Sequence, residues 1–139
     1  MSEVPDGFVA LDRPGDYLEL FGPLYRSGDP AIRNVIAMRA QKKHLNLRGI
    51  VHGGALASLI DTAFGITLWR TAEEKISTVT VGLAMDYLEP AKEGDWIEAH
   101  VDVLRIGRRL AFVEGLLLVG DRKVLRANGT FAVVEPRKQ

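Results

Sequence analysis

Cysteine is absent from this chain of 139 residues. Disulfide bonds, zinc–thiolate sites, iron–sulfur clusters and a thiol nucleophile are therefore excluded, and the absence fits a reducing compartment. An excess of one charge is lacking too, because 18 lysines and arginines balance 18 aspartates and glutamates. A protein that binds nucleic acid through its phosphates usually carries a basic excess, so we expect no nucleic-acid partner.

Long apolar runs are also missing from the sequence. No stretch reaches the 18 or so residues that cross a membrane as a helix. The acidic start, Met1–Asp6, lacks the apolar core of a secretory signal. We therefore expect a cytoplasmic protein with no membrane partner. Its composition, 47% hydrophobic and 26% charged, is that of a globular protein, and its length predicts a single domain over residues 1–139.

Proline and glycine interrupt the first part of the chain. Residues 1–30 contain Pro5, Pro14, Pro23 and Pro30, so we expect an irregular N-terminal segment. The one helical piece that we expect there covers residues 16–21, which are mostly apolar.

The rest of the sequence predicts an α+β domain. Residues 51–69 contain no proline and are apolar on most of the helical circumference, which is typical of a buried helix. Alternating apolar residues predict strands at 32–40, 78–88, 96–104, 110–119 and 124–134. In a domain of this size, this pattern indicates an antiparallel sheet of about five strands wrapped around one long central helix.

A stripe of small or acidic residues follows one side of the predicted helix. Gly54, Ser58, Asp61 and Gly65 are spaced so that they share one face. Such a stripe lets another backbone or a thin ligand approach closely. An aspartate there is either a buried residue with satisfied hydrogen bonds or a functional carboxylate, and spacing alone leaves both interpretations open.

The helix starts at a glycine pair, Gly53-Gly54. The pair could simply be a tight entry into the helix. Alternatively, its free N–H groups could bind an oxyanion, because the first turn of a helix has unpaired donors and a positive dipole end. Asn46 and His52 flank the pair and favour the functional interpretation.

The motif formed by Asn46, Gly49, His52, Gly53-Gly54 and Asp61 resembles that of the hotdog-fold acyl-CoA thioesterases. The branch that it resembles is the phenylacetate-pathway (PaaI-like) type, which also includes single-domain mammalian thioesterases. The resemblance covers roughly residues 21–135. It implies a hotdog fold and a thioester hydrolase that uses acyl-CoA as substrate and needs no cofactor or metal.

The resemblance also implies roles for individual residues. Asp61 corresponds to the catalytic acid, either as nucleophile or as general base, and the Gly53 N–H to the donor that polarises the thioester carbonyl. Asn46 helps to place the carbonyl or the water, and Thr80 orients the water. The residues expected to bind substrate or coenzyme A are His52, which mainly shapes its loop, Gly54, Arg108 and Arg109.

One departure distinguishes two branches of the family. A related branch uses Glu as the acid with a Thr one turn later, whereas this chain has Asp61 and Gly65 at those positions. The sequence therefore follows the Asp type. The remaining histidines, His44 and His100, lack metal-ligand spacing, and we expect them to be solvated.

The distance between Gly53 and Asp61 predicts a site made by two chains. Eight residues separate them, or about 12 Å along a straight helix, so Asp61 and Gly53 of one chain cannot act on the same carbonyl. The site then requires antiparallel helices across a two-fold axis. The resemblance agrees, since enzymes of this branch are homodimers that usually pair into homotetramers.

The acyl pocket and the activity each leave an alternative. We expect an apolar pocket for an aryl-acetyl or medium-chain acyl group, although its residues could equally belong to the core; they are Leu18, Phe21, Leu24, Tyr25, Leu56, Ile60 and Phe64. The alternative to an enzyme is a non-catalytic acyl-CoA-binding module, which would not need Asp61. A hydratase would need a His–acid motif that is not evident.

Overall fold

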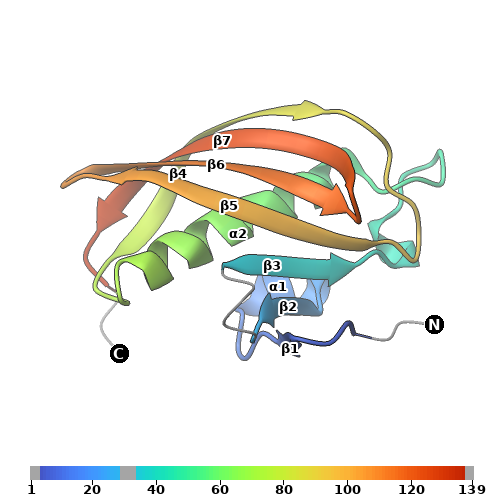
Figure 1. Cartoon of the computed structure of the whole chain (residues 1–139), viewed down its shortest axis with the longest axis horizontal. Helices are drawn as coiled ribbons and strands as arrows, with labels where there is room; N and C mark the ends of the chain where they lie inside the picture. Colours follow the sequence, from blue (N-terminus) through green and yellow to red (C-terminus); the bar gives the residue numbers. More distant parts are fainter. Residues whose placement is uncertain (1–3, 29–33, 137–139) are drawn as a thin grey trace.

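The computed structural model describes residues 4–28 and 34–136 and contains one long helix against a seven-stranded antiparallel sheet (Figure 1). The elements in chain order are β1 Phe8–Ala10, α1 Asp16–Phe21, β2 Leu24–Ser27, β3 Val35–Arg39, a 3-10 turn Lys42–His44, α2 Gly53–Thr71, β4 Ser77–Tyr87, β5 Trp96–Ile106, β6 Leu110–Val119 and β7 Arg122–Val134. The strand order is β1-β2-β3-β5-β6-β7-β4. The predicted α+β fold with a central helix is therefore confirmed.

The N-terminal segment is more ordered than the sequence indicates. It contains α1 as predicted, but also the short strands β1 and β2, which extend the sheet beyond β3. Strands of three and four residues are too short to show a reliable alternation. Of the strand predicted at 32–40, residues 32 and 33 lie outside the described residues, and β3 covers Val35–Arg39.

The helix is held against the sheet by close packing around Phe64, which is fully buried. Two glycines on neighbouring strands make room for its ring. A Cβ on Gly115 would lie 2.9 Å from Phe64, and one on Gly129 would lie 3.0 Å from it. Because real Cβ atoms almost never come so close, a side chain at either glycine would push the helix away. This contact fixes the position of α2 less than one turn from Asp61.

The expectation that His44 is solvated is wrong, because the residue is buried, with only 4% of its surface exposed. Its Nε2 donates to the Phe21 carbonyl at 2.6 Å, and its Nδ1 accepts from the Gln41 N–H at 2.9 Å. The His44 carbonyl in turn accepts from the His52 N–H at 2.7 Å. The ring therefore joins the N-terminal segment to the loop that leads into α2, a long-range partnership that sequence spacing does not reveal.

Burial lowers the pKa of His44 below its ordinary value of 6.5; the bond to the Phe21 carbonyl opposes the shift and the Lys43 charge adds to it. Between pH 6.5 and the lower folded-state pKa, the unfolded chain therefore binds a proton that the folded chain does not. The stability contributed by neutral His44 is complete above pH 6.5 and is lost as the pH falls through this window.

We predict that the free energy of unfolding decreases below pH 6.5 by at most about 1.4 kcal/mol per pH unit from this one group. His44→Gln can keep both hydrogen bonds without titrating, so it should remove this component. Chemical denaturation between pH 5 and 8 measures the effect, with His100→Gln as the control. Parallel pH profiles for wild type and His44→Gln would contradict the prediction.

Candidate active site

The N-terminus of α2 leaves one backbone donor open. His52 is the N-cap residue, and its Nδ1 accepts from the Gly54 N–H at 2.8 Å. The His52 carbonyl accepts from the next N–H groups, those of Ala55 and Leu56. Within the described part of the chain, no hydrogen bond uses the Gly53 N–H. This donor lies at the positive end of the helix dipole, where an oxyanion is stabilised.

Tyr87 closes one side of this helix end and was not identified from the sequence. Its hydroxyl donates to the Gly53 carbonyl at 2.9 Å, and its ring lies 3.3 Å from the position of a Cβ on Gly53. A larger residue at position 53 would therefore require the ring to shift. The only sequence signal for Tyr87 is its place at the end of a strand, which does not specify its partner.

Asn46 lies beside Gly53 in the same small cavity, of about 320 Å³. Its Oδ1 accepts from the backbone N–H groups of Arg48 and Ile50, at 2.9 and 3.3 Å. The side-chain carbonyl therefore holds the loop closed. The side-chain NH₂ has no partner among residues 4–28 and 34–136 and remains able to donate to a ligand.

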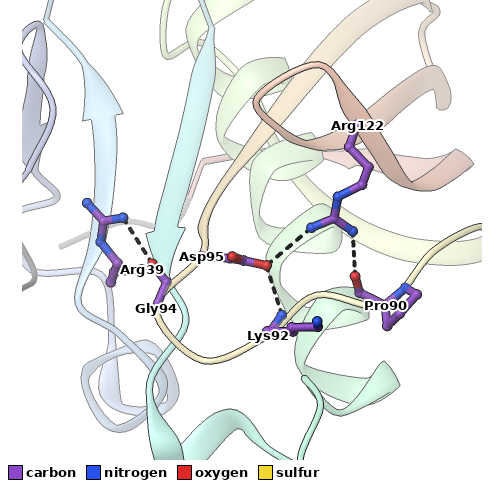
Figure 2. A network of polar contacts seen from close by, with 6 residues as sticks. All are labelled: Arg39, Pro90, Lys92, Gly94, Asp95 and Arg122. Carbon is purple, nitrogen blue, oxygen red and sulfur yellow. Dashed lines mark hydrogen bonds and ion pairs between the residues drawn. The ribbon is translucent and has the colours of Figure 1, made fainter.

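A polar network holds the other wall of this cavity, which the β4–β5 loop provides (Figure 2). Arg122 donates to the Pro90 carbonyl at 2.6 Å and to Asp95 Oδ2 at 3.4 Å. Asp95 also accepts from the Lys92 N–H at 2.9 Å, and Arg39 donates to the Gly94 carbonyl at 3.1 Å. These contacts tie the loop to β3 and β7, so that it stays next to the start of α2.

Asp61 and Thr80 form the second part of the site. Thr80 Oγ1 on β4 donates to Asp61 Oδ1 on α2 at 2.7 Å. Asp61 is half-buried, as are Ser58 and Gly65 on the same stripe, while the opposite face of α2 enters the core. The prediction of a helix buried nearly all round is therefore wrong for this stripe, which is only partly covered, by Tyr17 at Ser58 and by Thr80 at Asp61.

The two parts of the site lie apart in one chain. Asp61 and Thr80 line a cavity of about 740 Å³ that includes neither Gly53 nor Asn46. Both Gly53 and Asp61 belong to the same unbroken helix. The structure thus brings Asp61 together with Thr80 and Asn46 together with Gly53, but it does not bring the two pairs together.

Arg108 and Arg109 are exposed in the β5–β6 turn. The Arg109 carbonyl accepts from the Val133 N–H at 2.8 Å, and Val133 pairs with Thr78 on β4. This register places the turn at the Asp61–Thr80 end of the sheet. The two arginines therefore lie toward the Thr80 end of the sheet and not toward Gly53, although neither of them lines the Asp61 cavity.

Most residues expected to line the acyl pocket belong to the core. Of that set, only Leu18 borders the Asp61 cavity and only Leu56 the Gly53 cavity. Tyr25 packs against the Trp96 ring, and the others are buried core residues, namely Phe21, Leu24, Ile60 and Phe64. The residues that sequence reasoning missed include Ile66, Trp69, Arg26 and Arg70, which do line the Asp61 cavity.

His100 lies outside both parts of the site. His100 is half-buried and lies 2.9 Å from Glu98 Oε1. Across the described ranges, no three His, Cys, Asp or Glu side chains cluster as metal ligands would. None of the helices described here is long and apolar enough to cross a membrane.

Comparison with known proteins gives consistent results. The family profile described as Thioesterase superfamily matches residues 48–134. A Pseudomonas aeruginosa protein named as an esterase is 39% identical over 94% of this chain and 98% of its own length. Human acyl-coenzyme A thioesterase 13 is 35% identical over 56% of this chain and 55% of its own length.

Solved structures show the same fold. A variant of the phenylacetic acid degradation protein PaaI from Thermus thermophilus has a TM-score of 0.71 and 26% identity, covering 84% of this chain and 96% of its own. A Streptococcus mutans protein solved with bound acetyl-CoA has a TM-score of 0.68 and 25% identity, covering 75% of this chain and 82% of its own. The chain therefore belongs to the thioesterase superfamily, as a hotdog-fold, PaaI-like acyl-CoA thioester hydrolase.

Proposed function

We propose that the protein hydrolyses aryl-acetyl or medium-chain acyl-CoA to the free acid and coenzyme A, at sites shared between two chains. The observation that carries the proposal is the hydrogen bond between Thr80 and Asp61, 2.7 Å long, in a cavity that Gly53 does not line. A non-catalytic acyl-CoA-binding module would have no use for this half-buried carboxylate and its oriented partner.

The hydrogen bond suggests how water is placed. Thr80 donates its single hydroxyl hydrogen to Asp61 Oδ1, so toward a water molecule its oxygen can act only as a hydrogen-bond acceptor. A water that donates one proton to Thr80 and one to Asp61 turns a lone pair toward the thioester carbonyl. As the new C–O bond forms, Asp61 takes the proton of the water. The C–S bond then breaks, and the proton passes to the thiolate of coenzyme A.

The alternative role of Asp61 as nucleophile needs the same geometry. The carboxylate would attack the carbonyl, release the thiolate and leave an anhydride that water hydrolyses. In both routes negative charge develops on the carbonyl oxygen. The Gly53 N–H and the NH₂ of Asn46, both supplied by the partner chain, are the donors that would stabilise this charge.

The exposed edge of the sheet supports the shared site. β4 ends the strand order, so one side of its 11 residues has no partner strand among residues 4–28 and 34–136. Val79 and Val81, on either side of Thr80, are 57% and 61% exposed. A long apolar edge is a template for pairing with another chain. Two copies joined there would bring their α2 stripes together and could pair further into a tetramer.

Coenzyme A binding is proposed for Arg108 and Arg109. Their turn lies at the Asp61 end of the sheet and exposes both side chains. The nucleotide phosphates could therefore bind there while the thioester reaches Asp61, and guanidinium groups bind phosphates strongly. His52 and Gly54 would contribute by fixing the helix start, since their mutual hydrogen bond leaves Gly53 as the open donor.

Replacing the acid tests the enzyme against the binding module. Asp61→Asn keeps the shape and the Thr80 contact but removes the base or nucleophile, so we expect turnover to fall at least about 100-fold. Thiol release from octanoyl-CoA measures the rate, and circular dichroism checks the fold. Asp102→Asn, an exposed aspartate on β5, is the matched control. Turnover of Asp61→Asn close to wild type would rule out the proposed mechanism.

Mixing two inactive variants tests the shared site. An Asp61→Asn chain paired with an Asn46→Ala chain forms one intact and one doubly defective site. Free exchange should thus restore about a quarter of the wild-type activity, because half of the dimers are mixed and each has one working site. The control mixes Asp61→Asn chains with chains that carry both substitutions. A site within one chain would give no recovery after confirmed subunit exchange.

The acyl preference can be ranked on a panel of thioesters. The Asp61 cavity has apolar walls at Leu18, Ile66, Trp69 and Phe131, and apolar burial contributes about 25 cal/mol per Å². We expect phenylacetyl-CoA and octanoyl-CoA to have a higher kcat/KM than acetyl-CoA or malonyl-CoA. The panel is measured at one pH and salt concentration. Malonyl-CoA ranking first would contradict the proposed pocket, since its carboxylate would lie beside Asp61.

A further inference from the structure

Two arginines line the Asp61 cavity at the end opposite the acid. Arg70 lies near the end of α2, and Arg26 on β2 borders the same cavity. Between the acid and the end of α2, the residues that line the cavity include Asp61, Gly65, Ile66, Trp69 and Arg70. A ligand held at Asp61 can therefore extend along the helix until it meets both guanidinium groups.

These two guanidinium groups have no counterion in contact. Both side chains are half-buried, and among the described residues neither makes a salt bridge or a hydrogen bond. Burial lowers the pKa of Arg70; the like charge of Arg26 lowers it further, and Glu74 opposes the shift to a smaller extent. Glu74 therefore offsets only part of the repulsion between the two arginines. An oxyanion between them would remove this cost.

The other charges on the cavity wall do not replace such a ligand. Asp12, Arg13 and Glu74 are exposed residues of the N-terminal segment and of the turn after α2. In the described ranges, none of them forms an ion pair with Arg26 or Arg70 within 4.0 Å. Solvent screens exposed charges of this kind more than it screens the half-buried pair, so Arg26 and Arg70 are the groups of this wall best placed to bind an anion.

We propose that Arg26 and Arg70 form a specificity subsite that binds a carboxylate at the far end of the acyl group. The inference rests on the proposed function, because it places the thioester at Asp61. Nine residues separate Asp61 from Arg70, which is about 13.5 Å along the helix. The arginine side chain leans back toward the helix N-terminus and shortens this gap. The substrate class is thus a medium-length acyl group with a terminal carboxylate.

This length requirement separates two kinds of charged substrate. The carboxylate of a malonyl group is only two bonds from the thioester, so it stays next to Asp61 and is repelled. A dicarboxylic chain of eight carbons carries its charge past the apolar walls at Ile66 and Trp69. The same cavity therefore rejects a short charged acyl group and selects a long one.

The test compares octanedioyl-CoA with octanoyl-CoA, which differ only at the far end of the chain. We expect wild type to favour octanedioyl-CoA at least about tenfold in kcat/KM, since a charge-assisted bidentate pair is worth at least a factor of ten. In Arg70→Gln, Arg26→Gln and the double variant, this ratio should fall toward one. The ratio is taken within each variant, so partial loss of folded protein cancels.

Controls identify the source of the anion. Arg105→Gln, an exposed arginine of β5 outside the cavity, should keep the wild-type ratio. If the arginines bound a phosphate of coenzyme A, the variants would lose octanoyl-CoA turnover but keep turnover of octanoyl-pantetheine. That result, or a ratio unchanged in the double variant, would overturn the proposal.

A binding measurement separates this proposal from the proposed function. If wild type hydrolysed none of the thioesters, the proposed function would fail, but the subsite could still be examined. Free octanedioate should then raise the Tm of wild type more than octanoate does, and the double variant should lose this difference. Equal shifts for both acids in wild type would reject the subsite as well.

Discussion

The constraint on which the site depends is the rigidity of α2 between Gly53 and Asp61. An unbroken helix keeps the Gly53 N–H and the Asp61 carboxylate about 12 Å apart, so in one chain the two groups cannot act on the same carbonyl. The same spacing places Asp61 and Gly53 in two separate cavities. A flexible loop in place of the helix would permit a site within one chain.

Contacts at the start of the helix and on its core face hold it in place. His52 caps the start, and the Phe64 ring packs into the space left by Gly115 and Gly129. Through the His44 carbonyl, the start of the helix is also joined to the N-terminal segment. These contacts come from distant parts of the chain, so the position of Asp61 relative to Thr80 is a property of the whole fold.

The sequence predicts the architecture and the motif well. It predicts poorly which residues contact the motif and line the cavities. The helix is visible in the apolar run that contains Phe64, and the long strands are visible in their alternation, because both patterns reflect one-sided burial. Strands β1 and β2 are too short for such a pattern. His44, Tyr87 and Arg70 were misjudged or missed because their roles depend on partners far along the chain. The prediction of the acyl-pocket lining was mostly wrong for a related reason. In a sequence, an apolar residue such as Ile60 cannot be assigned to the core or to a pocket.

The position of Thr80 on the edge strand has a consequence for regulation by concentration. The same short segment holds Thr80, which donates a hydrogen bond to Asp61, and the exposed apolar side chains Val79 and Val81, where we propose that a second copy binds. With shared sites, a folded monomer holds a positioned carboxylate but no oxyanion donor to work with. Dilution alone would then switch the chemistry off while leaving every chain intact, so the amount of protein made would set the activity per molecule as well as the total.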